Sequence, residues 1–354
     1  MDRDTIRTML RDMLRARAFE EAAAQAYAQG EIAGFLHLYP GEEAVAVGVL
    51  HAAEPGDYVV STYREHVHAL VRGIPAAAIF AELLGKKTGV SGGMGGSMHL
   101  FDRERRFLGG YAIVGETFPI ALGAAYAVAY RQLPEAVLCF FGDGAVNQGT
   151  FHESLNMAAL WRLPILLVCE NNRYQIGTEI HRHSAVTEIY KRACGYGIPA
   201  EKVDGMDVLA VHEATRRALA RVRAGEGPQF LEMETYRFRG HSMADPGSYR
   251  PTVEVQAYEA NDPIAATLRG VEFHYPSADE LGSGHDCIQG FCDHCCQEGH
   301  LDEAALARLR QEVADEIAAA RDFARQSPAP SMDDAWAALL RNRRYDRLFE
   351  EQAP

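Results

Sequence analysis

Apolar positions near the N-terminus follow the spacing of an amphipathic helix. Most of them lie three or four residues apart, at Ile6, Met9, Leu10, Met13, Leu14 and Phe19. Gly30 follows as a C-cap, because glycine tolerates the left-handed backbone with which many helices end. The pattern therefore predicts that the chain begins in a helix that ends near Gly30.

From about residue 41 onward, short β-rich runs alternate with longer helical ones. The predicted strands are Asp57–Thr62, Ala136–Phe141, Pro164–Glu170 and Gln229–Tyr236. The predicted helices are Glu42–Ala52, Pro75–Leu84, Pro119–Tyr130, Thr150–Leu160 and Val208–Ala224. This alternation is typical of βα units, so we expect an α/β fold with a mostly parallel sheet.

Two regions depart from this rhythm. The glycine-rich stretch Gly89–Gly115 is too long for a routine connection, so we expect a functional or mobile loop there. After Arg250 the chain becomes acidic, alanine-rich and helical in pattern. We therefore divide it into an α/β domain with the N-terminal helix at 1–262 and a helical C-terminal extension at 263–354.

Composition and charge exclude several classes of protein. The 354 residues are 47% hydrophobic and 24% charged, as in an ordinary globular protein. A formal net charge of -14 disfavours binding to nucleic acid or to an anionic membrane surface. No run approaches the roughly 18 consecutive apolar residues of a membrane span. We expect neither nucleic acid nor a membrane among the partners.

The start of the chain and its cysteines indicate a compartment. The first residues carry acids and lack the apolar segment of a secretory signal, and they do not resemble a transit peptide. Seven cysteines are present, and Cys139, Cys169 and Cys194 lie in apolar segments. This usage fits a reducing compartment better than a disulfide scaffold, so we expect a cytoplasmic protein.

The stretch FFGDGAVNQG places Asp143 between two glycines directly after a predicted strand. A tight turn would explain an isolated Gly-Asp-Gly, because glycine tolerates positive φ. However, the next predicted strand ends just before Asn172, and right-handed crossovers bring both residues to the same edge of a parallel sheet. A carboxylate and an amide oxygen suit Mg²⁺ with a bound diphosphate. We therefore favour a magnesium diphosphate site.

Familiar phosphate-binding motifs do not explain this segment. A P-loop ending at Lys86 would need glycine where Phe80 stands, and a dinucleotide fingerprint would need glycine where Asn147 stands. The NH groups of Gly144 and Ala145, near the start of the next helix, could face phosphate instead.

Several segments together resemble a known family. GDGAVNQGTFHESLNMAALWRLPILLVCENNRY resembles the thiamine diphosphate motif, and GFLHLYPGEEAVAVG, STYREH, GGSMH, GGYAIVG, VDGMDVLAV and TYRFRGHSMADPGSYR follow the same family. The resemblance is to the E1 α subunit of pyruvate dehydrogenase complexes, from about Met9 to Asp262. It implies the thiamine diphosphate-binding fold, a mostly parallel twisted sheet flanked by helices, with a helical C-terminal region.

The resemblance also implies roles for individual residues. Mg²⁺ would be held by Asp143, Asn172 and the main-chain carbonyl of Tyr174. The diphosphate would be bound by Tyr63, Arg64, Gly144 and Ala145, with His241 as a further phosphate anchor that also serves catalysis. The aminopyrimidine would contact Ala112 and Val114, and the substrate would contact His37 and His66. Outside this resemblance, a lone histidine is more often a surface or packing residue, and Tyr-Arg is more often packing with a salt bridge.

The implied reaction is decarboxylation of a 2-oxo acid, with reductive acylation of the lipoyl group of an E2 acyltransferase. In the family a separate β subunit supplies an essential glutamate, so we expect an α₂β₂ heterotetramer and no activity from this chain alone. Pyruvate is the favoured substrate. HLYPGEEAVAVG also fits acetoin dehydrogenases, and branched-chain 2-oxo acid dehydrogenases share the cofactor residues. A non-catalytic module that binds a metal and a phosphorylated ligand is a further alternative.

The segment Gly282–His300 has no counterpart in the family pattern. It contains Cys287, Cys292, Cys295, Cys296, His285, His294 and His300. Four of them are candidate ligands of Zn or Fe, namely Cys287, Cys292, Cys295 and His300. The alternatives are a solvent-exposed insertion with free thiols, an adventitious disulfide, and a redox or metal sensor.

Overall fold

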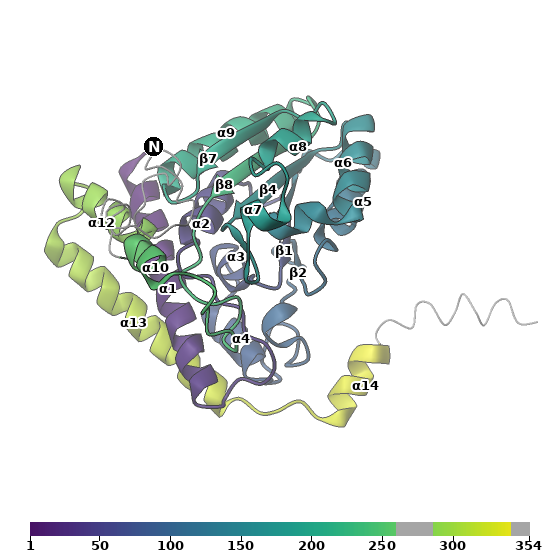
Figure 1. Cartoon of the computed structure of the whole chain (residues 1–354). Coiled ribbons are helices and arrows are strands. Elements are labelled where there is room, and N and C mark those ends of the chain that lie inside the picture. The colour runs from purple at the N-terminus through teal and green to yellow at the C-terminus, as the bar shows by residue number, and fades with distance from the viewer. Residues whose placement is uncertain (260–285, 341–354) are drawn as a thin grey trace, which may run out of the picture.

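The computed structural model describes residues 1–259 and 286–340 (Figure 1). The predicted boundary between 262 and 263 lies outside the described residues, as do positions 282–285 of the Cys/His-rich segment with His285.

A six-stranded sheet forms the centre of the protein, with the strand order β2-β1-β3-β4-β8-β7. Every neighbouring pair in it is parallel. The strands are β1 (Tyr58–Thr62), β2 (Phe107–Tyr111), β3 (Val137–Gly142), β4 (Ile165–Asn171), β7 (Ala200–Asp204) and β8 (Gln229–Glu234). A separate antiparallel pair consists of β5 (Tyr174–Gln175) and β6 (Thr178–Glu179). The four predicted strands are confirmed to within two residues at each end.

The sequence did not predict β5 and β6, and the two strands of the main sheet that it missed lie at the two edges of that sheet. β2 falls inside Gly89–Gly115, so this stretch is not one continuous loop. Its sequence FLGGY contains two glycines, which weaken a strand signal. β7 reads AEKVD and is mostly polar, as the outer strand of a sheet can be.

Helices cover both faces of the sheet (Figure 1). They are α1 (Arg3–Ala28), α2 (Glu43–Ala52), α3 (His66–Val71), α4 (Ala76–Leu83), α5 (Thr117–Tyr130), α6 (Gly149–Leu160), α7 (Ile180–His183), α8 (Tyr190–Cys194), α9 (Val208–Arg223), α10 (Thr252–Glu259), α12 (Cys287–Gln297), α13 (Glu303–Gln326) and α14 (Met332–Leu340). Two 3₁₀ helices are η1 (Gly96–Met98) and η2 (Asp143–Asn147). The predicted N-terminal helix is confirmed, and Gly30 after it has a positive φ of 75°.

The alternation of side chains along β3 explains the layers. Leu138 and Phe140 pack into one core with residues of α1, α2, α9 and α13, whereas Cys139 and Phe141 pack into a second core with residues of α5 and α6. Successive residues of a strand point to opposite faces, and both faces are buried here. The sheet is therefore the middle layer of a three-layer α/β structure.

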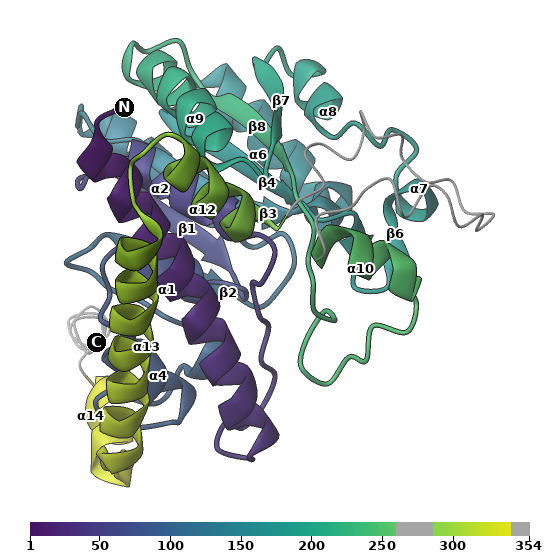
Figure 2. The same cartoon turned by 90° about the vertical axis from the view of Figure 1, so that its left-hand side faces the viewer.

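The C-terminal helices pack onto the N-terminal one. Figure 2 shows α13 beside α1, with α12 at one end of the pair, and both α12 and α13 contact α1. Val313 and Ile317 of α13 belong to the same core as the sheet. The described part of the predicted C-terminal extension thus shares its core with the α/β domain.

Among residues 1–259 and 286–340, no helix combines the length with the apolar character needed to cross a membrane.

Candidate active site

Residues that follow the strands converge at the carboxyl edge of the sheet. The parallel register pairs Gly142 of β3 with Glu170 of β4, so Asp143 and Asn172 leave the sheet side by side. Thr62 at the end of β1 pairs with Tyr111 at the end of β2. The segments Tyr63–Arg64 and Ala112–Val114 therefore start next to each other, at the edge where parallel sheets bind ligands.

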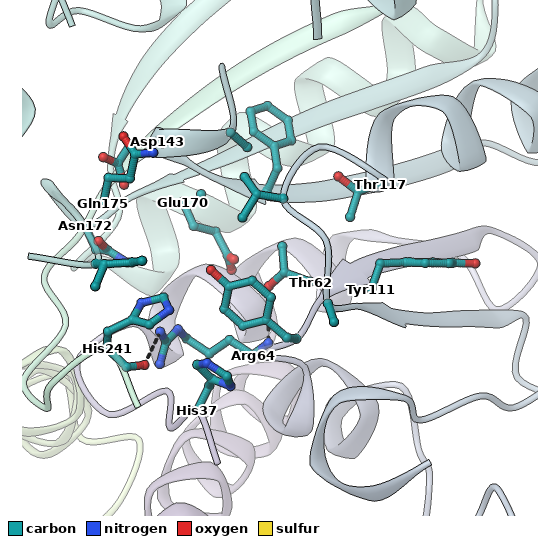
Figure 3. Close-up of a pocket in the computed structure, with 18 of the residues that line it drawn as sticks. His37, Thr62, Arg64, Tyr111, Thr117, Asp143, Glu170, Asn172, Gln175 and His241 are labelled. Atoms are coloured by element: carbon teal, nitrogen blue, oxygen red, sulfur yellow. Dashed lines mark hydrogen bonds between the residues drawn. The ribbon is translucent and has the colours of Figure 1, made fainter. Parts of the chain in front are cut away.

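A cavity of about 520 Å³ opens at this edge. Figure 3 shows Asp143, Asn172 and Gln175 on one side of it, with His37, Arg64 and His241 below. Its lining contains these predicted site residues: His37, Tyr63, Arg64, Ala112, Val114, Asp143, Gly144, Ala145, Asn172, Tyr174 and His241. One cavity thus gathers residues from six separate segments of the sequence.

Asp143 and Asn172 are both buried and both held in place. An oxygen of Asp143, Oδ2, lies 3.1 Å from Nε2 of His183. Asn172 donates from Nδ2 to Glu42 Oε1 at 3.1 Å, and its Oδ1 accepts from the main-chain NH of Tyr174 at 3.3 Å. Carboxylate, amide and main-chain carbonyl oxygens are the hard ligands that Mg²⁺ prefers.

The backbone at Gly144 leaves no room for a side chain. A Cβ atom built there would lie 2.5 Å from Cγ of Gln175. Because the residue after Asp143 lacks a side chain, the main chain at the start of η2 can lie against Gln175 and still face the cavity. Such a main-chain cradle suits a phosphate group.

Two buried guanidinium groups line the cavity. Arg64 donates to the carbonyl of Leu38 and, at 2.8 Å, to the carbonyl of His241. Arg237 is 1% exposed and donates to the carbonyl of Ile176 at 3.1 Å. Positive charges with fixed geometry favour a phosphorylated ligand.

Three aromatic rings pack against one another beside Arg64. The ring centres of His37 and Tyr63 are 4.5 Å apart, and those of His37 and His241 are 5.0 Å apart. Burial, followed by the charge of Arg64, lowers the pKa of His37 to about 2. The same causes lower the pKa of His241 to about 3. Both imidazoles are therefore neutral in the folded protein near pH 7.

The lining leaves several polar atoms without partners among the described residues. They are Nδ1 of His37, Oε2 of Glu42, Oγ1 of Thr117 and Nδ1 of His241, none of which has a hydrogen-bond partner there. Buried polar atoms are normally hydrogen-bonded, so these four indicate a polar ligand in the cavity. Together with the oxygen donors and the guanidinium groups, they fit a diphosphate with a divalent cation.

The comparison with known proteins agrees with this geometry. Residues 11–271 match the dehydrogenase E1 component family. The chain belongs to this family. The match covers more than half of the sequence and includes every residue that lines the cavity.

Several similar proteins carry the name pyruvate dehydrogenase E1 component subunit alpha. The one from Porphyra purpurea is 50% identical over 278 residues, which cover 76% of this chain and 81% of that protein. The one from Rhizobium meliloti is 43% identical over 330 residues, 93% of this chain and 88% of that protein. A third, from Zymomonas mobilis, is 43% identical over 340 residues, which cover 96% of this chain and 89% of that protein.

One predicted residue of this E1 family member lies away from the cavity. His66 is fully buried, with Nδ1 3.0 Å from Glu20 and Nε2 2.8 Å from the hydroxyl of Ser97. It is absent from the cavity lining within the described part of the chain. The geometry gives no support for contact between His66 and a substrate, and indicates that it ties α3 to α1 and η1.

Sequence reasoning missed several polar residues of the lining, among them Glu42, Glu170, Gln175 and Arg237. Burial raises the pKa of Glu42 above its usual range, although Arg64 opposes the rise. Glu170 accepts hydrogen bonds from Tyr39 and, at 3.0 Å, from His68. Buried carboxylates are rare, but a sequence alone does not reveal which glutamates are buried.

The Cys/His-rich segment forms helix α12, which packs on α1 and α2. Cys287, Cys292 and Cys295 are buried, so the alternative of a solvent-exposed insertion was wrong for them. All seven cysteines are free. Within residues 1–259 and 286–340, no three His, Cys, Asp or Glu residues are grouped to hold a metal ion. The Zn or Fe hypothesis for Cys287, Cys292, Cys295 and His300 thus gains no support there.

Proposed function

We propose that this chain is the α subunit of a thiamine diphosphate- and Mg²⁺-dependent pyruvate dehydrogenase. The observation that carries the proposal is the meeting of Asp143 and Asn172, from neighbouring parallel strands, in one cavity with buried guanidinium groups. The family membership and the names of the relatives support the same assignment.

The residues of the cavity divide into two groups by chemistry. Asp143, Asn172 and the carbonyl of Tyr174 would hold Mg²⁺, while Arg64 and Arg237 would neutralise the diphosphate. When bound, thiamine diphosphate supplies the electron sink that decarboxylation of a 2-oxo acid requires. The chain itself has to bind, orient and shield this cofactor.

Two neutral histidines suit the proton movements of such a reaction. Nδ1 of His37 and Nδ1 of His241 have no partner among the described residues, and both rings line the cavity. Neutral imidazole can accept a proton from a hydroxyl or hold one by a hydrogen bond. Phe141, a fully buried apolar residue of the lining, reduces the access of water.

A partner would have to cover an exposed apolar surface beside the cavity. Ile113 and Val114 at its mouth are 65% and 39% exposed, and α5 begins three residues later. Further exposed apolar side chains lie on α5, just after its C-terminal end and at the end of α6, and we call them the apolar strip. They are Ile120, Tyr126, Tyr130, Leu133, Leu160 and Trp161. Large exposed apolar patches mark protein interfaces. We propose the E1 β subunit as the partner on this strip, in an α₂β₂ heterotetramer that acylates the lipoyl domain of E2.

Removal of Asp143 tests the cofactor site. Asp143→Ala should abolish Mg²⁺-dependent binding of thiamine diphosphate, measured by calorimetry on the complex with the β subunit. The melting temperature should change little, because a ligand is removed and no core volume. Asp322→Ala, on the exposed face of α13, is the matched control and should bind normally. Retained binding in Asp143→Ala would reject the site.

Turnover with a β subunit and a lipoyl acceptor tests the substrate. We expect pyruvate to have the highest kcat/KM, and acetoin and branched-chain 2-oxo acids to be the competitors. A preference for either competitor would keep the cofactor site and change the substrate. Cofactor binding without turnover of any of the three would favour a non-catalytic module. The cytoplasmic location stays a prediction.

A further inference from the structure

A buried carboxylate, Glu42, lies between two side chains that the proposed function assigns to the cofactor. Its Oε1 accepts a hydrogen bond from Asn172 Nδ2 at 3.1 Å, and its Oε2 lies 3.9 Å from Arg64 Nε. Glu42 is 1% exposed, and Oε2 has no hydrogen-bond partner in the described part of the chain. One acid therefore faces both a candidate metal ligand and a candidate phosphate ligand.

The contact with Asn172 is directional because an amide has two different ends. The NH₂ end only donates hydrogen bonds, whereas the oxygen only accepts them. The carboxylate of Glu42 selects the NH₂ end and turns the oxygen of Asn172 to the opposite side, toward the NH of Tyr174. A divalent cation can bind only that oxygen, so the orientation of this amide decides whether Asn172 can be a ligand.

The backbone before Glu42 is fixed, so its side chain starts from a defined position. Gly41 has a φ of 101°, and a Cβ there would lie 2.1 Å from the carbonyl oxygen of Tyr236. The NH of Phe238 donates to the carbonyl of Pro40 at 2.9 Å. Gly41 also donates to a carboxylate oxygen of Glu43 at 2.8 Å. This turn is thus attached both to the segment after β8 and to α2.

We propose that Glu42 is a positioning residue, which holds the amide oxygen of Asn172 toward the metal and the guanidinium of Arg64 toward the diphosphate. The inference rests on the proposed function. Residues that orient a metal ligand typically change metal affinity by about 10–100-fold when they are replaced. Glu42 should therefore act mainly on metal affinity.

Glu42→Gln is the decisive variant because it keeps the size of the side chain. A glutamine has one acceptor oxygen, whereas both Asn172 Nδ2 and Arg64 Nε present donors. The NH₂ group of the glutamine must therefore face either the NH₂ group of Asn172 or the guanidinium of Arg64, so that two donors meet. We expect the affinity for Mn²⁺, used as the spectroscopic probe, to fall about tenfold or more in the presence of saturating thiamine diphosphate. Glu42→Leu removes both acceptors and should lose at least as much.

Glu232 provides the matched control. Its Oε1 accepts from Asn171 Nδ2 at 2.6 Å, and its Oε2 accepts from the NH of Tyr190 at 2.8 Å. It is 1% exposed, and within the described residues neither it nor Asn171 lines the cavity. Glu232→Gln therefore makes the same change at the neighbouring asparagine, and should leave Mn²⁺ affinity within about threefold of the original protein.

The measurement is the electron paramagnetic resonance signal of free Mn²⁺, titrated against the complex with the β subunit. A tenfold loss in Glu42→Gln with a normal control supports the inference. Unchanged affinity in Glu42→Gln, or equal losses in it and Glu232→Gln, would overturn it. If Glu42→Leu does not fold, Glu42→Gln alone carries the test. A lack of Mn²⁺-dependent cofactor binding in the unaltered protein would reject the proposed function itself.

Discussion

Burial controls the protonation states of single residues in the cavity. His37 and His241 lie 5.0 Å apart between ring centres, beside the guanidinium of Arg64. A positive charge on either imidazole would be desolvated and would face Arg64 at close range. Both rings therefore stay neutral, and their Nδ1 atoms, which have no hydrogen-bond partner in the described ranges, are suited to proton transfer and hydrogen bonding.

The same property predicts how stability depends on pH. In the unfolded chain both imidazoles bind a proton near pH 6.5, whereas the folded pKa values are about 2 for His37 and about 3 for His241. Below pH 6.5 the unfolded state binds more protons, so stability falls as the pH falls toward about 3. We expect a loss on the order of 1 kcal/mol per histidine for each pH unit below about 6. Urea unfolding at several pH values measures it.

Substitution distinguishes the contribution of these histidines to the pH dependence of stability from the contributions of other titrating groups. His37→Asn and His241→Asn should each flatten the decline of unfolding free energy between pH 7 and about pH 5. His152, an exposed residue of α6, supplies the control, and His152→Gln should keep the original slope. Slopes of His37→Asn and His241→Asn that match the slope of the unaltered protein would show that these histidines do not cause the decline.

Part of the site could be predicted from the sequence, because the positions of some residues depend only on the strands that precede them. Asp143 and Asn172 follow predicted strands, so the parallel-sheet rule was enough to bring them together. Glu42 reaches Asn172 across 130 positions of the chain, and no local pattern contains that contact. His66 was a further difficulty, because its direction depends on how α3 packs against Glu20.

Among the elements, α12 shows how a cysteine-rich segment can serve packing. Its apolar side is formed by Ile288 and Phe291 together with three cysteines, and these residues share a core with Met9 and Leu10 of α1. Burial raises the pKa of Cys295 to about 12, which disfavours the thiolate that a metal requires. These cysteines thus behave as small apolar side chains.

This packing predicts a large effect of truncating Phe291. The side chain is 5% exposed, so Phe291→Ala should lower the free energy of unfolding by about 3 kcal/mol or more. Gln297→Ala, on the exposed side of the same helix, should change it by less than about 0.5 kcal/mol. Thermal or urea unfolding measures both.

Elemental analysis and chelation distinguish packing from metal binding in α12. We expect less than about a tenth of an equivalent of Zn or Fe per chain, and no shift of the melting temperature with a chelator. A stoichiometric metal, or a fall in melting temperature on chelation, would contradict the packing explanation and restore the metal hypothesis for Cys287, Cys292, Cys295 and His300.

Elements with a strong apolar pattern, continuous or periodic, were predictable, and elements with a weak one were not. β3 and β4 are continuous apolar runs, which is typical of strands buried on both faces. α3 has only six residues and directly follows the polar Arg64–Glu65, so it offered no periodic signal. β2 and β7 form as outer strands because a neighbouring strand supplies their hydrogen bonds.

At the scale of the whole molecule, one continuous segment of the chain connects the cavity with the apolar strip. The chain passes from the cavity at Ala112–Val114 directly into α5, and Tyr126 of α5 lies 5.5 Å from Trp161, between ring centres. A partner that covers the strip would also reach the mouth of the cavity. The proposed β subunit would cover the large apolar side chains that are exposed on this strip.

A charge on the strip should therefore impair assembly without harming the fold. Tyr130 is 78% exposed, so Tyr130→Glu should leave the melting temperature of the isolated chain nearly unchanged. Burying the new carboxylate against a partner is unfavourable, and tyrosine is a frequent hot spot, so affinity for the β subunit should fall about tenfold or more. Sedimentation of mixtures of the two subunits measures this affinity, and turnover should fall in parallel at limiting β subunit.

Phe323→Glu on α13 is the matched control, since Phe323 is also exposed and apolar but lies outside the strip. Unchanged affinity in Tyr130→Glu, or an equal loss in the control, would place the partner elsewhere.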